Sequence, residues 1–247
     1  MSVLLVTTDY RILVDANDHP VWLPFEAVAP ERYQEALATH TTTHVAVRAT
    51  ETDLDTWGNT TGMSWKTLRS HLQEPHVAAA VAQLKFRENY RFHPTTGEPL
   101  EHPGGRALGS GKQVFPRIDP AVIGLVELDG ADKILLGRNR LRPDYFSLIA
   151  GYVGLGESLE TAWAREVLEE TGRHVHHIEY WGSQPWPSSG SLMVAFRGRT
   201  IDEHPTQQTD NELLEVLWAS RDDLSHVPLA APGSIARTLI DAWREEI

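Results

Sequence analysis

The chain of 247 residues has no cysteine, which excludes disulfides and thiolate-ligated metal sites. A chain without cysteine fits the cytoplasm, and we expect that compartment. Long apolar runs are also missing, and no basic segment precedes the short apolar stretch at the N-terminus. The sequence therefore predicts neither a membrane span nor a secretory signal. Lys and Arg are scarce, 22 against 34 Asp and Glu, and the net charge of −12 disfavours broad contact with a nucleic-acid backbone.

The remaining composition is that of an ordinary globular protein, with 41% hydrophobic and 23% charged residues, long enough for one or two domains. Residues 1–75 alternate short apolar runs with turns, which indicates a small β-rich domain. From residue 119 to 247 strands and helices alternate, which is typical of an α/β sandwich. His40 and His44 have the spacing of a helical metal pair, but the three intervening threonines disfavour a helix, so we interpret both as structural or exposed.

Residues 151–172 are a glycine-rich turn followed by an amphipathic helix. Ser158 suits the N-cap, and Gly172 suits the left-handed residue that ends a helix. Glu166, Glu169 and Glu170 have i, i+3, i+4 spacing, which places three carboxylates on one face. Because like charges repel, one interpretation is a solvated acidic face. The other is a site for a hard divalent cation, which prefers carboxylate oxygens and shares its coordination with phosphate.

The glycines, Glu157 and Arg165 favour the metal site. The spacing Gly-x5-Glu-x7-Arg-Glu-x2-Glu-Glu-x-Gly resembles the Nudix box at every charged and glycine position, and Arg173 stands where an aliphatic residue is usual. The chain is identified as a member of the Nudix superfamily, which implies an α/β/α sandwich. The catalytic residues that the resemblance implies are Glu157, Arg165, Glu166, Glu169 and Glu170.

Two flanking segments resemble the NADH pyrophosphatase branch of that superfamily. Residues 183–193 are similar to its SQPWPFPxS motif, with serines replacing the usual Phe and Pro, and residues 115–123 are similar to the strand that enters its catalytic domain. In that branch a zinc ribbon with two Cys-x-x-Cys pairs precedes this strand. Here His93 and His102 are too few to form a four-ligand site, so no zinc is expected.

The expected organisation has three parts. An N-terminal domain similar to that of NADH pyrophosphatases spans residues 1–75. A helix and a degenerate, metal-free ribbon held by packing span residues 76–118. The Nudix catalytic domain spans residues 119–247.

The same resemblance assigns individual residues. The metal ligands that it implies are the carboxylates of Glu166, Glu170 and Glu212 and the backbone carbonyl of Ala150. A shift of one turn in the alignment would exchange Glu212 with Glu215. The residues that it implies for substrate binding are Tyr152, Gln184, Trp186, Ser191, Ala236 and Arg69.

Some positions carry a second interpretation. Trp186 offers a flat face to a nucleotide between two stiffening prolines, and the alternative is packing in a core or a dimer interface. The basic run from Arg138 to Arg142 attracts phosphate or is a solvated strand end. Phe25 stands where some relatives have lysine, so one phosphate contact is expected to be missing.

The function implied is hydrolysis of the pyrophosphate bond of NADH or NAD⁺ to nicotinamide mononucleotide and AMP, with Mg²⁺ or Mn²⁺ and with Glu169 orienting or deprotonating the water. Removal of NAD caps from RNA 5′ ends is also implied, and the acidic charge places the free dinucleotide first. One alternative is hydrolysis of other nucleoside diphosphate derivatives such as ADP-ribose. Another is an inactive ligand sensor, which the complete set of box glutamates disfavours. A homodimer is implied, and no membrane partner is expected.

Overall fold

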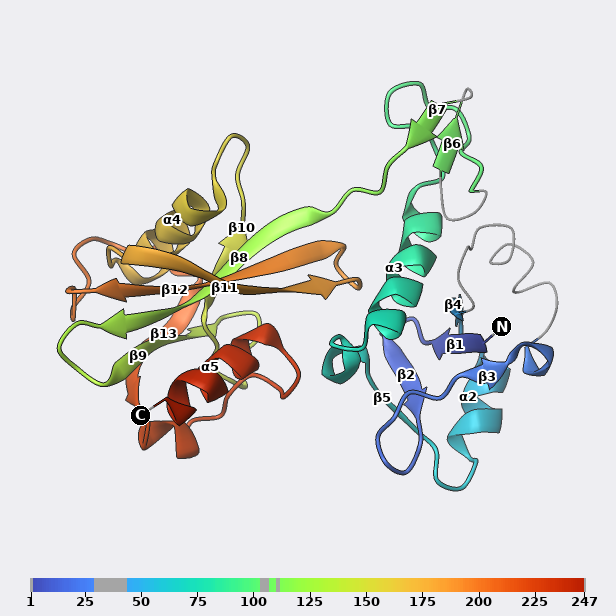
Figure 1. Ribbon diagram of the computed structural model, residues 1–247, viewed down its shortest axis with the longest axis horizontal. Coiled ribbons are helices and arrows are strands. Elements are labelled where there is room, and N and C mark those ends of the chain that lie inside the picture. Colours follow the sequence, from blue (N-terminus) through green and yellow to red (C-terminus); the bar gives the residue numbers. More distant parts are fainter. Residues whose placement is uncertain (1, 29–43, 103–106, 110–111, 247) are drawn as a thin grey trace. The chain divides into compact units, whose positions relative to one another are not determined.

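The computed structural model describes residues 2–28, 44–102, 107–109 and 112–246 (Figure 1). It divides into two compact units. The first is Met1–Ile118 together with Trp186–Gly190, and the second is Asp119–Pro185 together with Ser191–Ile247. No helix in these described ranges is both long and apolar enough to cross a membrane. The three-part organisation expected from the sequence stays a prediction, and His40 lies outside the described residues.

A sheet of five strands, counted among the described residues, organises the first unit. Its strands are β1 (Ser2–Val6), β2 (Arg11–Val14), β3 (Leu23–Pro24), β4 (His44–Arg48) and β5 (Ser64–Thr67). Strand β1 runs antiparallel to β2 and β3 and parallel to β4. Leu4 and Val6 pack with Val77 and Val81 of α3 (Pro75–Asn89), while alternate β1 residues face a second core cluster. The sequence predicts strands at residues 3–6, 11–14, 21–24 and 44–49 and a helix from residue 75 to about 90. The structure confirms these elements, with the third strand shortened to Leu23–Pro24.

Short elements that the apolar pattern did not predict complete this unit. Helix α2 (Glu51–Gly58) begins with a capping box, in which Thr50 accepts the Asp53 N–H and Asp53 accepts the Thr50 N–H. The residues that mark the start of α2 are polar, so hydrophobic periodicity does not reveal this helix. The 3₁₀ helices η1 (Phe25–Ala27) and η2 (Leu68–His71) also belong to this unit.

The segment expected to be a ribbon forms the antiparallel pair β6 (Ala107–Gly109) and β7 (Lys112–Val114). Phe86, Leu100 and Ala107 form a small apolar cluster beside it. The ring nitrogens of both histidines in this segment contact its own backbone. His93 Nδ1 accepts the N–H groups of Thr95 and Thr96, and His102 Nε2 lies 2.6 Å from the Tyr90 carbonyl oxygen. Apolar packing and local hydrogen bonds therefore hold this segment.

The second unit is built on a sheet that has six strands in the described part of the chain. They are β8 (Asp119–Leu128), β9 (Lys133–Asn139), β10 (Ile149–Tyr152), β11 (His176–Trp186), β12 (Ser191–Thr200) and β13 (Leu213–Ser220). Strand β8 lies parallel to β12 and antiparallel to β9 and β10, and β9 lies antiparallel to β13. The helices of this unit are α4 (Leu159–Thr171), α5 (Ile235–Glu245) and the 3₁₀ helix η4 (Asp223–Ser225).

Helices α4 and α5 cover opposite faces of this sheet (Figure 1). Val122 and Val126 of β8 pack with Trp163 and Val167 of α4. The intervening Ile123 and Leu125 pack with α5 instead. This period-2 alternation buries both faces of one strand and produces the predicted α/β/α sandwich.

The apolar run at residues 146–150 predicts a strand that leads into the box, and the observed strand begins later. The ladder starts at Ile149 and continues to Tyr152. The Phe146 N–H donates to the Pro228 carbonyl and the Phe146 carbonyl accepts the Ala230 N–H, so Phe146 is paired with a loop. Its ring packs in the core cluster that also contains residues of α5. The sequence also predicts a strand at residues 175–181, and the observed β11 continues beyond it to Trp186.

Gly124 is the position in the sheet where a methyl group is expected to be most destabilising. A Cβ there would lie 2.2 Å from Trp163 Cζ2 and 2.8 Å from the Phe196 carbonyl oxygen. Neither a fully buried ring nor a strand backbone moves cheaply, so Gly124→Ala is expected to destabilise the protein by about 3 kcal/mol. Urea unfolding followed by tryptophan fluorescence measures the loss. Gly182→Ala is the matched control, because no atom lies within 4 Å of its Cβ position. Equal unfolding midpoints for the two variants would contradict this packing.

Candidate active site

The turn and helix that carry the box are defined by local capping. Ser158 Oγ accepts the Thr161 N–H at 3.2 Å and starts α4. The helix ends at Gly172, which has φ 70° and donates its N–H to the Leu168 carbonyl at 2.9 Å. Both predicted caps are confirmed. Since β10 leads directly into this turn, the sheet and the helix are fixed to each other through residues 153–157.

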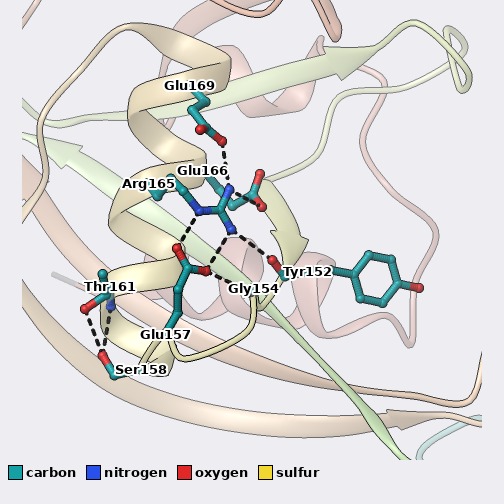
Figure 2. Close-up of polar contacts among 8 residues, drawn as sticks. All are labelled: Tyr152, Gly154, Glu157, Ser158, Thr161, Arg165, Glu166 and Glu169. Atoms are coloured by element: carbon teal, nitrogen blue, oxygen red, sulfur yellow. Dashed lines mark hydrogen bonds and ion pairs between the residues drawn. The ribbon is translucent and has the colours of Figure 1, made fainter.

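Arg165 is the hub of the polar contacts in the box (Figure 2). Its Nε and Nη2 donate to the two Glu157 oxygens at 2.7 and 3.0 Å, and Nη2 also donates to the Tyr152 carbonyl at 3.0 Å. Its Nη1 donates to Glu166 Oε1 at 2.9 Å and to Glu169 Oε2 at 2.7 Å. Glu157 raises the pKa of Arg165, and Arg165 in turn lowers the pKa of Glu157. One guanidinium therefore fastens the turn to the helix and directs two helix carboxylates.

Arg165→Lys is expected to lower kcat/KM by about 10- to 100-fold while the protein stays folded. A lysine keeps the charge but lacks the planar fork, so it cannot hold Glu157 bidentately and still reach Glu166 and Glu169. Steady-state kinetics with circular dichroism measures the effect. The control is Arg199→Lys, because Arg199 is exposed and its ion pair with Asp129 is long, at 4.0 Å. Wild-type kinetics in Arg165→Lys would contradict the hub role.

Carboxylates converge on Glu170, whose side chain is only 3% exposed. Burial, the largest cause, acts together with the nearby charges of Glu212, Glu166 and Asp210 to raise the pKa of Glu170 to about 9, and the charge of Arg142 opposes them. Burial also raises the pKa of Glu166, which Arg165 partly offsets. These side chains therefore form one negatively charged group around a buried carboxyl.

The backbone of β10 leaves room for this group at Gly151. A Cβ built on Gly151 would lie 2.0 Å from Glu166 Cδ, so the Glu166 carboxylate rests directly against the strand backbone. Ala150, whose carbonyl was predicted as a ligand, precedes this point on the same strand. Only glycine permits so close an approach.

The structure separates Glu212 from Glu215. Glu212 is close enough to Glu166 and Glu170 to raise both pKa values, and its Oε1 accepts a hydrogen bond from Asn139 Nδ2 at 2.9 Å. Glu215 forms an ion pair with Arg138 at 2.6 Å. A register shift between Leu213 and Glu215 in the β9–β13 ladder places the two glutamates differently. This arrangement supports Glu212 as the ligand.

The donor set fits a hard divalent cation by its chemistry. Glu166, Glu170 and Glu212 offer oxygen ligands, and a cation would relieve the mutual repulsion that their raised pKa values reflect. Among the residues that the structure describes, no three His, Cys, Asp or Glu side chains form a group that could hold a metal ion. Glu166 directs one oxygen to Arg165, so binding requires the carboxylates to close around the ion.

Of the predicted substrate residues in the second unit, Tyr152 and Ser191 lie together. The Tyr152 ring is 58% exposed and points away from Arg165 (Figure 2), and its hydroxyl lies 3.2 Å from Ser191 Oγ. Gln184 is 5% exposed, donates to the Gly233 carbonyl and accepts the Ile235 N–H at the start of α5. Ala236 lies in the core with α5. The structure thus gives Gln184 and Ala236 structural surroundings, and their substrate contacts stay predictions.

The other predicted substrate residues, Arg69 and Trp186, lie together in the first unit. The Arg69 guanidinium carbon is 5.0 Å from the centre of the Trp186 ring, and Trp186 packs against the core cluster that holds α3. This packing matches the alternative interpretation of Trp186 as an anchor. The sequence did not reveal the roles of Asp210 and Asn139. The Asp210 N–H donates to the Glu169 carbonyl of α4, and Asn139 of β9 donates to the Glu212 carboxylate, because the loop before β13 folds back onto these two elements.

Residues 118–240 match the NUDIX domain family. The chain belongs to the Nudix hydrolase family. It is 40% identical over 186 residues to the NAD-capped RNA hydrolase NudC of Mycobacterium bovis (strain BCG / Pasteur 1173P2), a match covering 68% of this chain and 59% of that protein. It is 42% identical over 131 residues to the NudC of Escherichia coli O157:H7, covering 53% of this chain and 49% of that protein. The match thus spans about half to three fifths of these curated relatives.

Among solved structures, a NUDIX hydrolase from Nitrosomonas europaea is similar with a TM-score of 0.47 and 20% identity. That match covers 63% of this chain and 91% of the other.

Proposed function

We propose that this chain is a metal-dependent pyrophosphohydrolase that cleaves NADH or NAD⁺ into nicotinamide mononucleotide and AMP. The observation that carries the proposal is the carboxylate group around the buried Glu170, held beside a complete Nudix box. The names of the relatives, both NAD-capped RNA hydrolases, support a nicotinamide dinucleotide as substrate.

The reaction is addition of water across the phosphorus–oxygen–phosphorus bridge. Mg²⁺ or Mn²⁺ held by Glu166, Glu170, Glu212 and the Ala150 carbonyl would supply charge neutralisation and Lewis acidity. Glu169 accepts the proton of the attacking water, and the departing phosphate oxygen carries the negative charge released when the bridge breaks. Arg165 holds Glu169 Oε2 at 2.7 Å, which fixes the direction of that carboxylate.

Recognition of the dinucleotide is assigned to exposed groups near the box. The Tyr152 ring stands in solvent with its hydroxyl against Ser191, which suits stacking on a nicotinamide or adenine ring. The net charge of −12 disfavours long contact with an RNA backbone, so the free dinucleotide comes first. NAD-capped RNA is the second substrate form, entering by its 5′ end.

A substrate panel tests the proposal. Purified protein is incubated with NADH, NAD⁺, ADP-ribose and an NAD-capped oligoribonucleotide, each with Mg²⁺, with Mn²⁺ and with EDTA, and products are separated by chromatography. We expect nicotinamide mononucleotide and AMP from the dinucleotides, and no product in EDTA. Faster cleavage of ADP-ribose would assign the alternative substrate class, and no cleavage of any compound would favour the sensor.

A cytoplasmic homodimer is the remaining part of the proposal, supported by the resemblance to the NADH pyrophosphatase branch. Light scattering after size-exclusion chromatography measures the assembly state, and twice the chain mass of 27.6 kDa is expected. A monomer at micromolar concentration would contradict the proposed homodimer without affecting the proposed chemistry of the box.

A further inference from the structure

The turn formed by residues 138–142, called the basic turn below, lies directly beside a proposed metal ligand. Asn139 Nδ2 donates to Glu212 Oε1 at 2.9 Å, and the Arg140 N–H donates to the Glu212 carbonyl at 3.1 Å. The turn is closed by the Arg142 N–H, which donates to the Asn139 carbonyl at 3.0 Å. One side-chain hydrogen bond and one backbone hydrogen bond to Glu212 thus fix the basic turn against the carboxylate group.

The three arginines of the basic turn have different surroundings. Arg138 forms an ion pair with Glu215, and Arg140 donates from Nε and Nη2 to the Asn211 carbonyl. Arg142 is exposed, and its side chain makes no hydrogen bond or ion pair with any residue in the described ranges. Arg138 is therefore held by β13 and Arg140 by the loop before it, and the guanidinium of Arg142 is open to solvent.

Hydrogen bonds place Arg142 close to the carboxylate group. Its N–H donates to the carbonyl of Asn139, whose side chain donates to Glu212. A guanidinium presents five N–H donors in a planar fork that matches two phosphate oxygens. In the proposed function the neighbouring carboxylates would hold a cation, so an exposed guanidinium on this turn would meet the phosphates of a metal-bound dinucleotide.

We propose that Arg142 is a substrate-binding residue that donates to a phosphate oxygen of the dinucleotide pyrophosphate. The inference rests on the proposed function for the nature of the substrate. It explains how an acidic protein attracts a doubly charged pyrophosphate, because one guanidinium adds to the charge of the cation. Arg138 and Arg140 are excluded from this role by the partners that they already have.

The test compares Arg142→Gln, Arg142→Lys and the control Arg199→Gln. Kinetics with NAD⁺ and Mg²⁺ gives kcat and KM at low and high NaCl. Calorimetry measures binding of NAD⁺ and of ADP-ribose to each variant in an added Glu170→Gln background, in which turnover is blocked. We expect Arg142→Gln to weaken binding and raise KM by about 10- to 100-fold. Arg142→Lys should keep part of the affinity, and salt should weaken binding less in Arg142→Gln than in wild type. Arg199→Gln should behave as wild type.

The outcomes separate this inference from the proposed function. Hydrolysis of NAD⁺ with unchanged KM and affinity in Arg142→Gln would overturn the inference alone. Binding that depends on Arg142, in a wild-type protein that hydrolyses neither nucleotide, would overturn the function alone. A lowered melting temperature in Arg142→Gln with unchanged affinity would show a structural role and overturn the inference. If neither nucleotide binds the Glu170→Gln protein or is hydrolysed by the wild type, both proposals fall.

Discussion

Glu170→Gln is expected to abolish hydrolysis and, at the same time, to make the metal-free protein harder to unfold. Hydrolysis should fall by about 10³-fold or more, because a proposed ligand that concentrates charge on the pyrophosphate is lost. The gain in stability has a separate cause. Glu170 is almost fully buried among acids, and a neutral amide of the same shape removes the cost of ionising it there.

The direction of the predicted change in stability follows from how the ionisation of Glu170 depends on pH. The pKa of Glu170 is about 9 in the folded protein and 4.5 for a glutamate free in water, so the folded state binds the proton more tightly. The stability that this proton confers is complete below pH 4.5 and is lost as pH rises toward 9. In EDTA, the advantage of the Gln variant should therefore be below about 1 kcal/mol at pH 5 and on the order of 4 to 5 kcal/mol at pH 8.

Urea unfolding at the two pH values measures the difference in stability, and the NAD⁺ assay measures the difference in activity. The control is Glu160→Gln, an exposed position in the first turn of the same helix. It should change stability by only a few tenths of a kcal/mol and leave turnover intact. Retained turnover in Glu170→Gln would show that the carboxylate group takes no part in the mechanism. A loss of stability at pH 8 would show that a partner stabilises the ionised Glu170 carboxylate by more than its burial destabilises it.

Gly151→Ala should reduce kcat/KM by about 100-fold and leave stability within about 1 kcal/mol of wild type. The new Cβ would lie 2.0 Å from Glu166 Cδ, so the carboxylate has to move by an ångström or more. A flexible side chain moves at small cost in folding energy. A displaced ligand, however, no longer meets the cation and the pyrophosphate in the geometry of the transition state.

Kinetics and a Mn²⁺ titration measure the loss, and Gly182→Ala again serves as control. The expected contrast with Gly124→Ala follows from the identity of the obstructing atoms. At Gly124 they belong to a buried ring and a strand backbone, so the energy is lost from folding. At Gly151 they belong to the end of a glutamate, so the loss appears in catalysis. Full activity in Gly151→Ala would mean that the Glu166 position is not used.

Much of the fold was predictable because its signals are local. The apolar run at residues 121–128 predicts the strand found as β8, and Ser158 and Gly172 predict the two helix ends without any distant partner. The later start of β10 was not predictable, because Phe146 is apolar and resembles a strand residue. Its backbone pairs with residues 228–230, more than 80 positions away.

The sequence by itself determined which carboxylates share one helix face and which arginine accompanies them, because the 3.6-residue period of a helix fixes those relations within a few turns. Tertiary structure alone decided what those carboxylates meet. The close approach of Glu166 to Gly151, the burial of Glu170 and the choice of Glu212 over Glu215 depend on how α4 packs on the sheet and on a register shift in the β9–β13 ladder. No spacing along the chain encodes these contacts, because they join segments that only the folded core brings together.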